Sequence, residues 1–303
     1  MFDIYAAVTS RILEQLEQGS IPWRKPWTGS PDLAVSHAKL RPYSLVNQLL
    51  LGEPGEFLTL KQCNEEGGRV KKGSKSRMVV FWKIFDRPEL DSNGAQVFDS
   101  DGNVRMHTIP VLRYYRVFSV NDCEGITPRR PAPEALPHVD IDQRAEAIFA
   151  DYQTREHLAG FSNSLSDRAF YRPATDEICL PLRDQFTGSD EYYSTLFHEA
   201  VHSTGHSSRL NRFDNNGASA FGSASYSREE LVAEIGAASI LHYLGIETPE
   251  TFSNSASYID GWSKSVRKDP KLFISATSRA EKAVRMILGS SANAPEAFDA
   301  ADQ

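Results

Sequence analysis

The stretch YYSTLFHEAVHSTGH, residues 192–206, carries the pattern from which the second half of the chain can be interpreted. His198, Glu199 and His202 follow the order H-E-x-x-H. Residues four apart share one face of a helix, so both imidazoles can approach one metal ion. Glu199 is then displaced around the helix, beside the ion, where a general base takes a proton from an activated water. The stretch therefore predicts a helix that carries a catalytic metal site.

The neighbouring residues indicate that this helix is buried on most sides. Leu196 and Phe197 precede the pattern, and Ala200 and Val201 occupy its variable positions. Buried histidines without partners carry a desolvation cost, which a bound metal ion removes. A partly exposed helix with solvated histidines is the alternative interpretation.

A hydrolytic zinc site needs a third protein ligand and an open position for water. Gly205 is expected to end or loosen the helix before His206, and the longer histidine pattern would need a histidine where Ser208 stands. The stronger candidate is an acid on the next predicted helix, which begins with SREELVAEIGAA at residues 227–238. Small residues at positions 233, 236 and 237 would let that helix approach the histidine helix closely.

Glu230 and Glu234 share one face of this second helix. We assign Glu230 as the third ligand and Glu234 as the carboxylate that orients a ligand histidine. His206 is expected to hydrogen-bond substrate or backbone beside the centre. The reverse assignment of the two acids stays open, Glu229 is a third choice, and a solvated helix face is the alternative for these acids. The expected ion is Zn²⁺, with Mn²⁺ or another divalent transition metal as alternatives.

The remaining sequence predicts an α+β protein of two domains. Four prolines in TPRRPAPEALPHVD oppose regular structure, so residues 128–140 are taken as a linker between domains at 1–127 and 141–290, with a flexible acidic tail at 291–303. The first domain is expected to be α+β and the second mainly helical. Residues 1–130 carry a net charge of +3 and residues 131–303 a net charge of −10, which sum to the total of −7. Only the first domain would tolerate a polyanion.

Periodicity and turn residues predict the individual elements. Helices are expected at 3–18, 44–51, 58–66, 141–156, through the histidine stretch, from Ser227 to a stop at Gly245, and around 278–288. Ser227 and Glu230 have the spacing of a capping box. Strands are expected at 77–85 and 111–120, joined by a long hairpin, and as a second hairpin around the turn PATD at 173–176.

Two stretches of the first half combine aromatic and basic residues. IPWRKPW, residues 21–27, places Trp23, Arg24, Lys25 and Trp27 on a loop stiffened by prolines. Indoles can stack on unpaired bases and cations can pair with phosphates, although tryptophans that fill the core are the alternative. Residues 60–83 carry a net charge of +5. Their candidate phosphate contacts are Arg69, Lys71, Lys72, Lys75 and Arg77, with a solvated basic hairpin as the alternative.

The cysteines and the apolar runs indicate the cellular compartment of the protein. Cys63, Cys123 and Cys179 are widely spaced without a C-x-x-C, which argues against a disulfide framework and fits a reducing cytoplasm. Apolar runs such as LVNQLLL are far shorter than the ~18 residues that a membrane helix needs, and the N-terminus has the pattern of an amphipathic helix. We therefore expect a cytoplasmic protein with no membrane segment.

Several motifs in one order resemble the ArdC-type antirestriction proteins, whose first domain is shared with plasmid TraC-type primases. The first half is similar through IPWRKPW, RPYSLVNQLLL, FLTLKQCNEEGGRVKKGSKSRMVVFWK and RYYRVFSVND, and the second through LFHEAVHSTGHSSRLNR and SREELVAEIGAASIL. The resemblance covers most of residues 1–290. It implies sequence-nonspecific single-stranded DNA binding by the first domain, a zincin-type metallopeptidase domain with Glu230 as third ligand, and protection of incoming plasmid DNA from restriction.

The sequence leaves the cleaved protein open; a component of the host restriction machinery is the expected substrate. One rival hypothesis is a non-catalytic DNA-binding protein with a structural or vestigial metal site. A second is a nuclease or primase-like enzyme, but no carboxylate cluster suited to magnesium accompanies the histidines.

Overall fold

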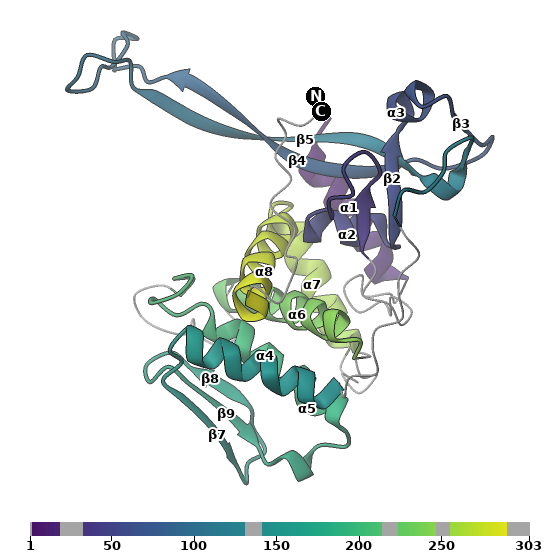
Figure 1. The fold of residues 1–303 in the computed structure, drawn as a ribbon. Helices are drawn as coiled ribbons and strands as arrows, with labels where there is room; N and C mark the ends of the chain where they lie inside the picture. Colours follow the sequence, from purple (N-terminus) through teal and green to yellow (C-terminus); the bar gives the residue numbers. More distant parts are fainter. Residues whose placement is uncertain (1, 19–32, 131–140, 214–223, 247–254, 290–303) are drawn as a thin grey trace.

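The computed structural model describes residues 2–18, 33–130, 141–213, 224–246 and 255–289 (Figure 1). The architecture is α+β, as predicted from the sequence. The helices are α1 (Ile4–Glu17), α2 (Leu45–Leu51), α3 (Leu60–Glu65), α4 (Ile141–Arg155), α5 (Ser189–Ser203), α6 (Ala224–Leu244), α7 (Ser255–Lys268) and α8 (Leu272–Leu288). The strands are β1 (Ala34–Ser36), β2 (Gly55–Thr59), β3 (Arg69–Val70), β4 (Arg77–Pro88), β5 (Met106–Ser119), β6 (Cys123–Glu124), β7 (Gly160–Ser164), β8 (Phe170–Arg172) and β9 (Glu177–Pro181).

The first half is built on a four-stranded sheet in the order β1-β2-β5-β4, with β1 parallel to β2 and the other pairs antiparallel. Helix α1 begins after Asp3, whose side chain accepts a hydrogen bond from the Ala6 amide. Its buried face includes Val8, Ile12 and Leu16, three of the positions that gave the amphipathic pattern. This face packs into the main hydrophobic core.

Strands β4 and β5 form a hairpin that is longer than predicted. Their pairing runs without interruption from Arg77 opposite Val117 to Pro88 opposite Met106. We call residues 77–119 the arm; residues 77–85 and 109–119 form its shaft, and residues 86–108 form its tip. Figure 1 shows the outer end of the arm projecting away from the body, whereas its inner part lies in the four-stranded sheet.

The second half combines helices with a small sheet in the order β7-β9-β8. The predicted hairpin around residues 173–176 is confirmed, because β8 and β9 pair antiparallel across it. Strand β7 joins β9 in parallel and was not predicted, since its sequence GFSNS has neither apolar alternation nor a β-branched residue. Helix α7 was also missing from the prediction.

One hydrophobic core extends across both halves. It joins Val8 and Leu49 of the first half to Phe273 and Ala280 of α8. Polar contacts cross the same boundary: the Thr9 hydroxyl donates to the Pro270 carbonyl. The two halves are therefore packed together through α1, α2, α7 and α8.

Two predicted helix starts differ from the structure. Residues 58 and 59 belong to β2, so α3 starts at Leu60. Helix α6 starts at Ala224, one turn earlier than predicted, so Ser227 lies inside its first turn and is not its N-cap. Its predicted stop is confirmed, because Gly245 follows the last helical residue with φ of 75°. In the described part of the chain, no helix combines the length and apolar character needed to cross a bilayer.

Candidate metal centre

Helix α5 carries the two histidines of the H-E-x-x-H pattern. Asp190 and Glu191 lie in its first turn, where acidic side chains complement the helix dipole. The helix ends at Ser203, as the glycine at position 205 predicted. A Cβ atom added at Gly205 would lie 2.7 Å from the Phe213 ring, so this position has no room for a side chain.

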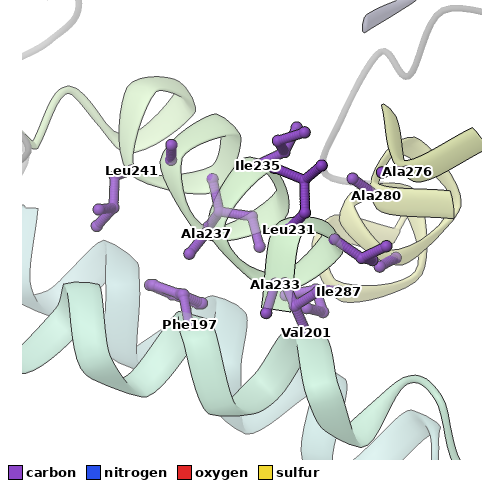
Figure 2. Packing of buried hydrophobic residues seen from close by; sticks show 14 of the residues in the cluster. Phe197, Val201, Leu231, Ala233, Ile235, Ala237, Leu241, Ala276, Ala280 and Ile287 are labelled. Atoms are coloured by element: carbon purple, nitrogen blue, oxygen red, sulfur yellow. The ribbon is translucent and has the colours of Figure 1, made fainter. Parts of the chain in front are cut away.

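Helix α6 lies directly against α5. Figure 2 shows Phe197 and Val201 of α5 beside Ala233 and Ala237 of α6. A Cβ atom added at Gly236 would lie 2.8 Å from the Cγ2 atom of Val201. The small residues on α6 thus allow the close approach that the sequence predicted.

This approach brings three candidate ligands together. The Nε2 atoms of His198 and His202 are 3.1 Å apart. One carboxylate oxygen of Glu230 lies 3.5 Å from His198 Nε2 and the other lies 3.5 Å from His202 Nε2. One potential ligand atom from each of the three residues lies within 4.8 Å of the other two. Two nitrogens and one oxygen converging in this way form the donor set of a three-ligand zinc site.

Each histidine also faces a second carboxylate with its other ring nitrogen. The Nδ1 atom of His198 lies 4.0 Å from Glu234 Oε1, and that of His202 lies 3.5 Å from Glu229 Oε1. Carboxylates in these positions fix the orientation of ligand histidines. Glu234 therefore lies where the sequence placed an orienting acid, and Glu229 lies in the equivalent position for the other ring.

Glu229 is itself held by Arg212, which the sequence analysis did not single out. The guanidinium contacts the Glu229 carboxylate at 2.6 Å and donates to Thr204 Oγ1 and the Val201 carbonyl. Burial would raise the pKa of Glu229, but hydrogen bonds from His202 and Arg212 lower it below its ordinary value. Arg212 thus connects the end of α5 to the start of α6 behind His202.

The electrostatics of the cluster favour a cation. Burial alone would lower the pKa of His198, but the hydrogen bond with Glu230 and the charges of Glu199 and Glu234 raise it to about 9. Glu199 is only 8% exposed, and its carboxylate has no hydrogen-bond partner in the described part of the chain. Several carboxylates around two imidazoles are the environment that a bound divalent ion would neutralise. The residues present therefore fit a divalent metal ion.

His206 does not join the histidine pair. Its Nδ1 atom pairs with the Ser208 hydroxyl at 2.8 Å. The loop that carries it is fixed by Arg209, which donates to the Ser203 carbonyl and contacts Asp176 at 3.0 Å. His206 therefore lies on a loop that Arg209 ties to the end of α5 and to Asp176.

Comparison with known proteins identifies both halves. A family model described as a zincin-like metallopeptidase matches residues 143–279, and one described as the N-terminal domain of anti-restriction factor ArdC matches residues 2–118. The crystal structure of antirestriction ArdC from plasmid R388 in its Mn(II)-bound form is 30% identical, with a TM-score of 0.73. The alignment covers 96% of this chain and 99% of that one. This chain belongs to the ArdC-type antirestriction family.

Several other proteins are also similar to this chain. The metal-free structure of the R388 ArdC protein matches with a TM-score of 0.71. A DNA primase TraC of Escherichia coli is 36% identical over 291 residues, but the chain spans only 19% of its length. A second E. coli TraC primase is spanned over 26% of its length. The uncharacterized protein y4eC of Sinorhizobium fredii is 33% identical, with 90% of its length covered.

The predicted DNA contacts of the ArdC-type N-terminal region differ in whether they have partners within the chain. Trp23, Arg24, Lys25 and Trp27 lie outside the described residues. Three of the five other predicted contacts have partners within the chain: Arg69 pairs with Glu124, Lys71 donates to the Asn121 carbonyl, and Arg77 contacts both Glu53 and the Leu51 carbonyl. Lys72 and Lys75 are exposed and have no partner among the described residues. The latter two are therefore the better placed to meet a phosphate.

Proposed function

We propose that this protein is a zinc-dependent peptidase joined to a single-stranded DNA-binding domain, and that it protects incoming plasmid DNA from restriction in the cytoplasm. Family membership supports the antirestriction role. The observation that carries the peptidase part is the convergence of His198, His202 and Glu230 within 4.8 Å. The proposed protein substrate is a component of the host restriction machinery.

In this proposal His198, His202 and Glu230 hold the ion. A bound zinc ion supplies Lewis acidity, which polarises an amide carbonyl and makes water a stronger acid. The chemistry at the protein then falls to Glu199, whose buried carboxylate is free to accept a proton. Glu199 takes a proton from the attacking water and returns it to the amine nitrogen as the C–N bond breaks. Glu234 and Glu229 keep the two rings in place.

Manganese is the natural rival ion, because the R388 relative was crystallised with Mn(II). Two imidazoles and one carboxylate suit zinc as well as manganese. Metal quantification of the protein purified without added metal separates them. Zinc as the resident ion supports the proposal, and a chain isolated with magnesium alone contradicts it.

The peptidase is tested with the Glu199→Ala variant. We expect this variant to keep its metal and to lose cleavage of denatured casein, measured with and without single-stranded DNA. Glu191→Ala is the matched control, because Glu191 lies on the same helix. Its carboxylate accepts hydrogen bonds from the Thr187 amide and hydroxyl, away from the histidines. Cleavage that persists in Glu199→Ala would refute the assigned role.

The same two variants test protection in cells. Loss of protection in Glu199→Ala, with the control still active, links antirestriction to proteolysis. Protection that survives in Glu199→Ala would identify a protein that acts by binding, with a structural metal site.

The DNA-binding part is tested with charge reversal at Lys71, Lys72 and Lys75. Each cation that pairs with a phosphate of a single strand contributes about −0.7 to the slope of log affinity against log salt concentration. The triple variant should bind an oligothymidine more weakly and with a shallower slope. An unchanged slope would move the DNA contacts away from this loop.

A further inference from the structure

The arm presents two faces of different chemistry. Side chains alternate between the faces of a strand, and residues paired across an antiparallel ladder lie on the same face. The odd face of the shaft carries Phe81 opposite Arg113, Lys83 opposite Val111, and Phe85 opposite Ile109. The even face carries Trp82 opposite Leu112 and Ile84 opposite Pro110.

On the odd face, cations and rings are already arranged together. The Lys83 ammonium lies 5.3 Å from the centre of the Phe85 ring, and the Arg113 guanidinium lies 5.9 Å from it. Phe81 contacts Tyr115 with ring centres 5.5 Å apart. Cation–π contacts of this kind hold the charged groups in place without neutralising them.

The charges of this face are free to take an anion. Lys83 and Arg113 are exposed, and neither forms an ion pair with a described residue. The shaft contains four basic residues and no acid, so its net charge is +4. The tip carries five acids against two arginines, a net charge of −3. A polyanion would therefore be drawn to the shaft and repelled by the tip.

We propose that the outer part of the odd face, formed by Phe81, Lys83, Phe85 and Arg113, is a binding site for a short stretch of single-stranded DNA. This site rests on the proposed DNA-binding function and locates a contact that the basic loop does not include. Alternating rings and cations match a single strand, which presents bases and phosphates in turn. An acidic peptide would use the cations but leave the rings unused.

The length of the site is set by the body and the tip. Val79 and Val117 at the inner end are fully buried in the core, and Asp86 starts the acidic tip. The four residue steps from Phe81 to Phe85 span about 13 Å, at about 3.3 Å a residue. The arm therefore holds only a few nucleotides, and the remainder of a longer strand would lie on other basic parts of the domain.

The two faces provide matched variants for the test. Lys83→Ala combined with Arg113→Ala removes the odd-face cations, whereas Arg116→Ala removes an exposed cation from the even face of the same strand. With oligothymidine, the odd-face double variant should lose about tenfold in affinity, and its salt slope should fall by about 1.4, which is twice the value for one phosphate contact. Arg116→Ala should change the slope by less than half of that amount.

The rings are tested with Phe85→Leu and with Trp82→Leu on the opposite face. The wild type should bind oligothymidine at least ~5-fold more tightly than an abasic strand of equal length, because stacking of a single base contributes about that factor. Phe85→Leu should reduce this preference and Trp82→Leu should preserve it. Circular dichroism and thermal unfolding would show that each variant is folded.

The outcomes separate this site from the proposed function. A wild type that binds no single strand overturns both. A wild type that binds, with equal losses from the two faces or none from either, overturns the odd-face site alone. Loss of affinity only from Trp82→Leu and Arg116→Ala would place the strand on the opposite face and likewise contradict the proposal.

Discussion

The helix pair α5–α6 and the arm place their charged side chains in opposite environments. In the helix pair, charged groups are largely buried, and each candidate ligand histidine lies within 4.0 Å of a carboxylate at both ring nitrogens. In the arm, apolar and basic groups are exposed: Trp82 is 41% and Ile84 55% exposed. A buried charge must be compensated by specific neighbours, whereas an exposed one needs none. The helix pair should therefore be sensitive to single atoms, and the exposed outer part of the arm should be tolerant of large changes.

The largest effect on stability is expected at the loop that follows α5. Arg209 is only 1% exposed in its side chain and pairs with Asp176, which also accepts a hydrogen bond from Tyr171 at 2.7 Å. Asp176→Asn should lower the free energy of unfolding by about 3–5 kcal/mol, because it leaves a buried guanidinium without its counter-charge. Asparagine tolerates the left-handed backbone found at this position, where φ is 51°. Asp151→Asn, in an exposed pair with Arg155, should cost less than ~1 kcal/mol.

The pair of Asp176 and Arg209 should also make the stability of the protein depend on pH. Burial would raise the pKa of Asp176, but hydrogen bonds from Arg209 and Tyr171 lower it below its ordinary value. A carboxyl group whose pKa is lower in the folded state stabilises the protein at pH values above its unfolded-state pKa. This stabilisation is lost as the pH falls through the folded-state pKa. The stability difference between wild type and Asp176→Asn should therefore be full at neutral pH and shrink below about pH 4. Denaturant unfolding at several pH values measures it, and a difference that grows on acidification would contradict this assignment.

The next largest effect is expected on metal affinity, when a carboxylate beside the histidines is compared with one far from them. Glu229→Gln keeps the shape of the side chain but removes the charge that faces His202 and Arg212. Loss of such an orienting carboxylate weakens metal binding by about 10–100-fold. Zinc competition with a chromophoric chelator measures it. Glu281→Gln on α8 is the control, since Glu281 pairs with Arg285 away from the histidines; equal losses in the two variants would remove the special role of Glu229.

The packing of α5 on α6 should respond to one methyl group. Gly236→Ala places a carbon 2.8 Å from the stiff, fully buried Val201 side chain. Overpacking costs about 1–3 kcal/mol, which outweighs the ~1 kcal/mol gained in helix propensity. Gly261→Ala in α7, where no described atom lies within 4 Å, should be neutral or stabilising. Combining Gly236→Ala with Val201→Ala should restore part of the lost stability in thermal unfolding, and a failure to do so would disprove the steric cause.

The contrast also explains which features the sequence could predict. The spacing of His198 and His202 and the small face of α6 follow from helical periodicity, so they could be predicted from the sequence alone. The link from Arg212 to Glu229 was not, because it depends on the path of the loop after α5. The sequence also could not show which cations have partners within the chain. Arg77 was predicted to contact a phosphate, but it pairs with Glu53 and donates to the Leu51 carbonyl. The arm was predicted as a hairpin, but its full length depends on ladder pairing at its polar end.

The smallest effect is expected from removing the end of the arm. Pro88 and Met106 face each other in the ladder, so residues 89–105 can be replaced by an Asn-Gly turn without changing the register. No residue of this segment belongs to a hydrophobic core cluster formed by the described residues. We expect the free energy of unfolding to stay within about 0.5 kcal/mol of wild type and metal affinity to be unchanged. Because residues 89–105 include four of the five acids of the tip and one of its two arginines, single-strand affinity should hold or rise slightly. A marked loss of stability would show that the end of the arm is part of the folded body, and a tenfold loss of DNA affinity would show that the strand is bound at the tip and not along the shaft.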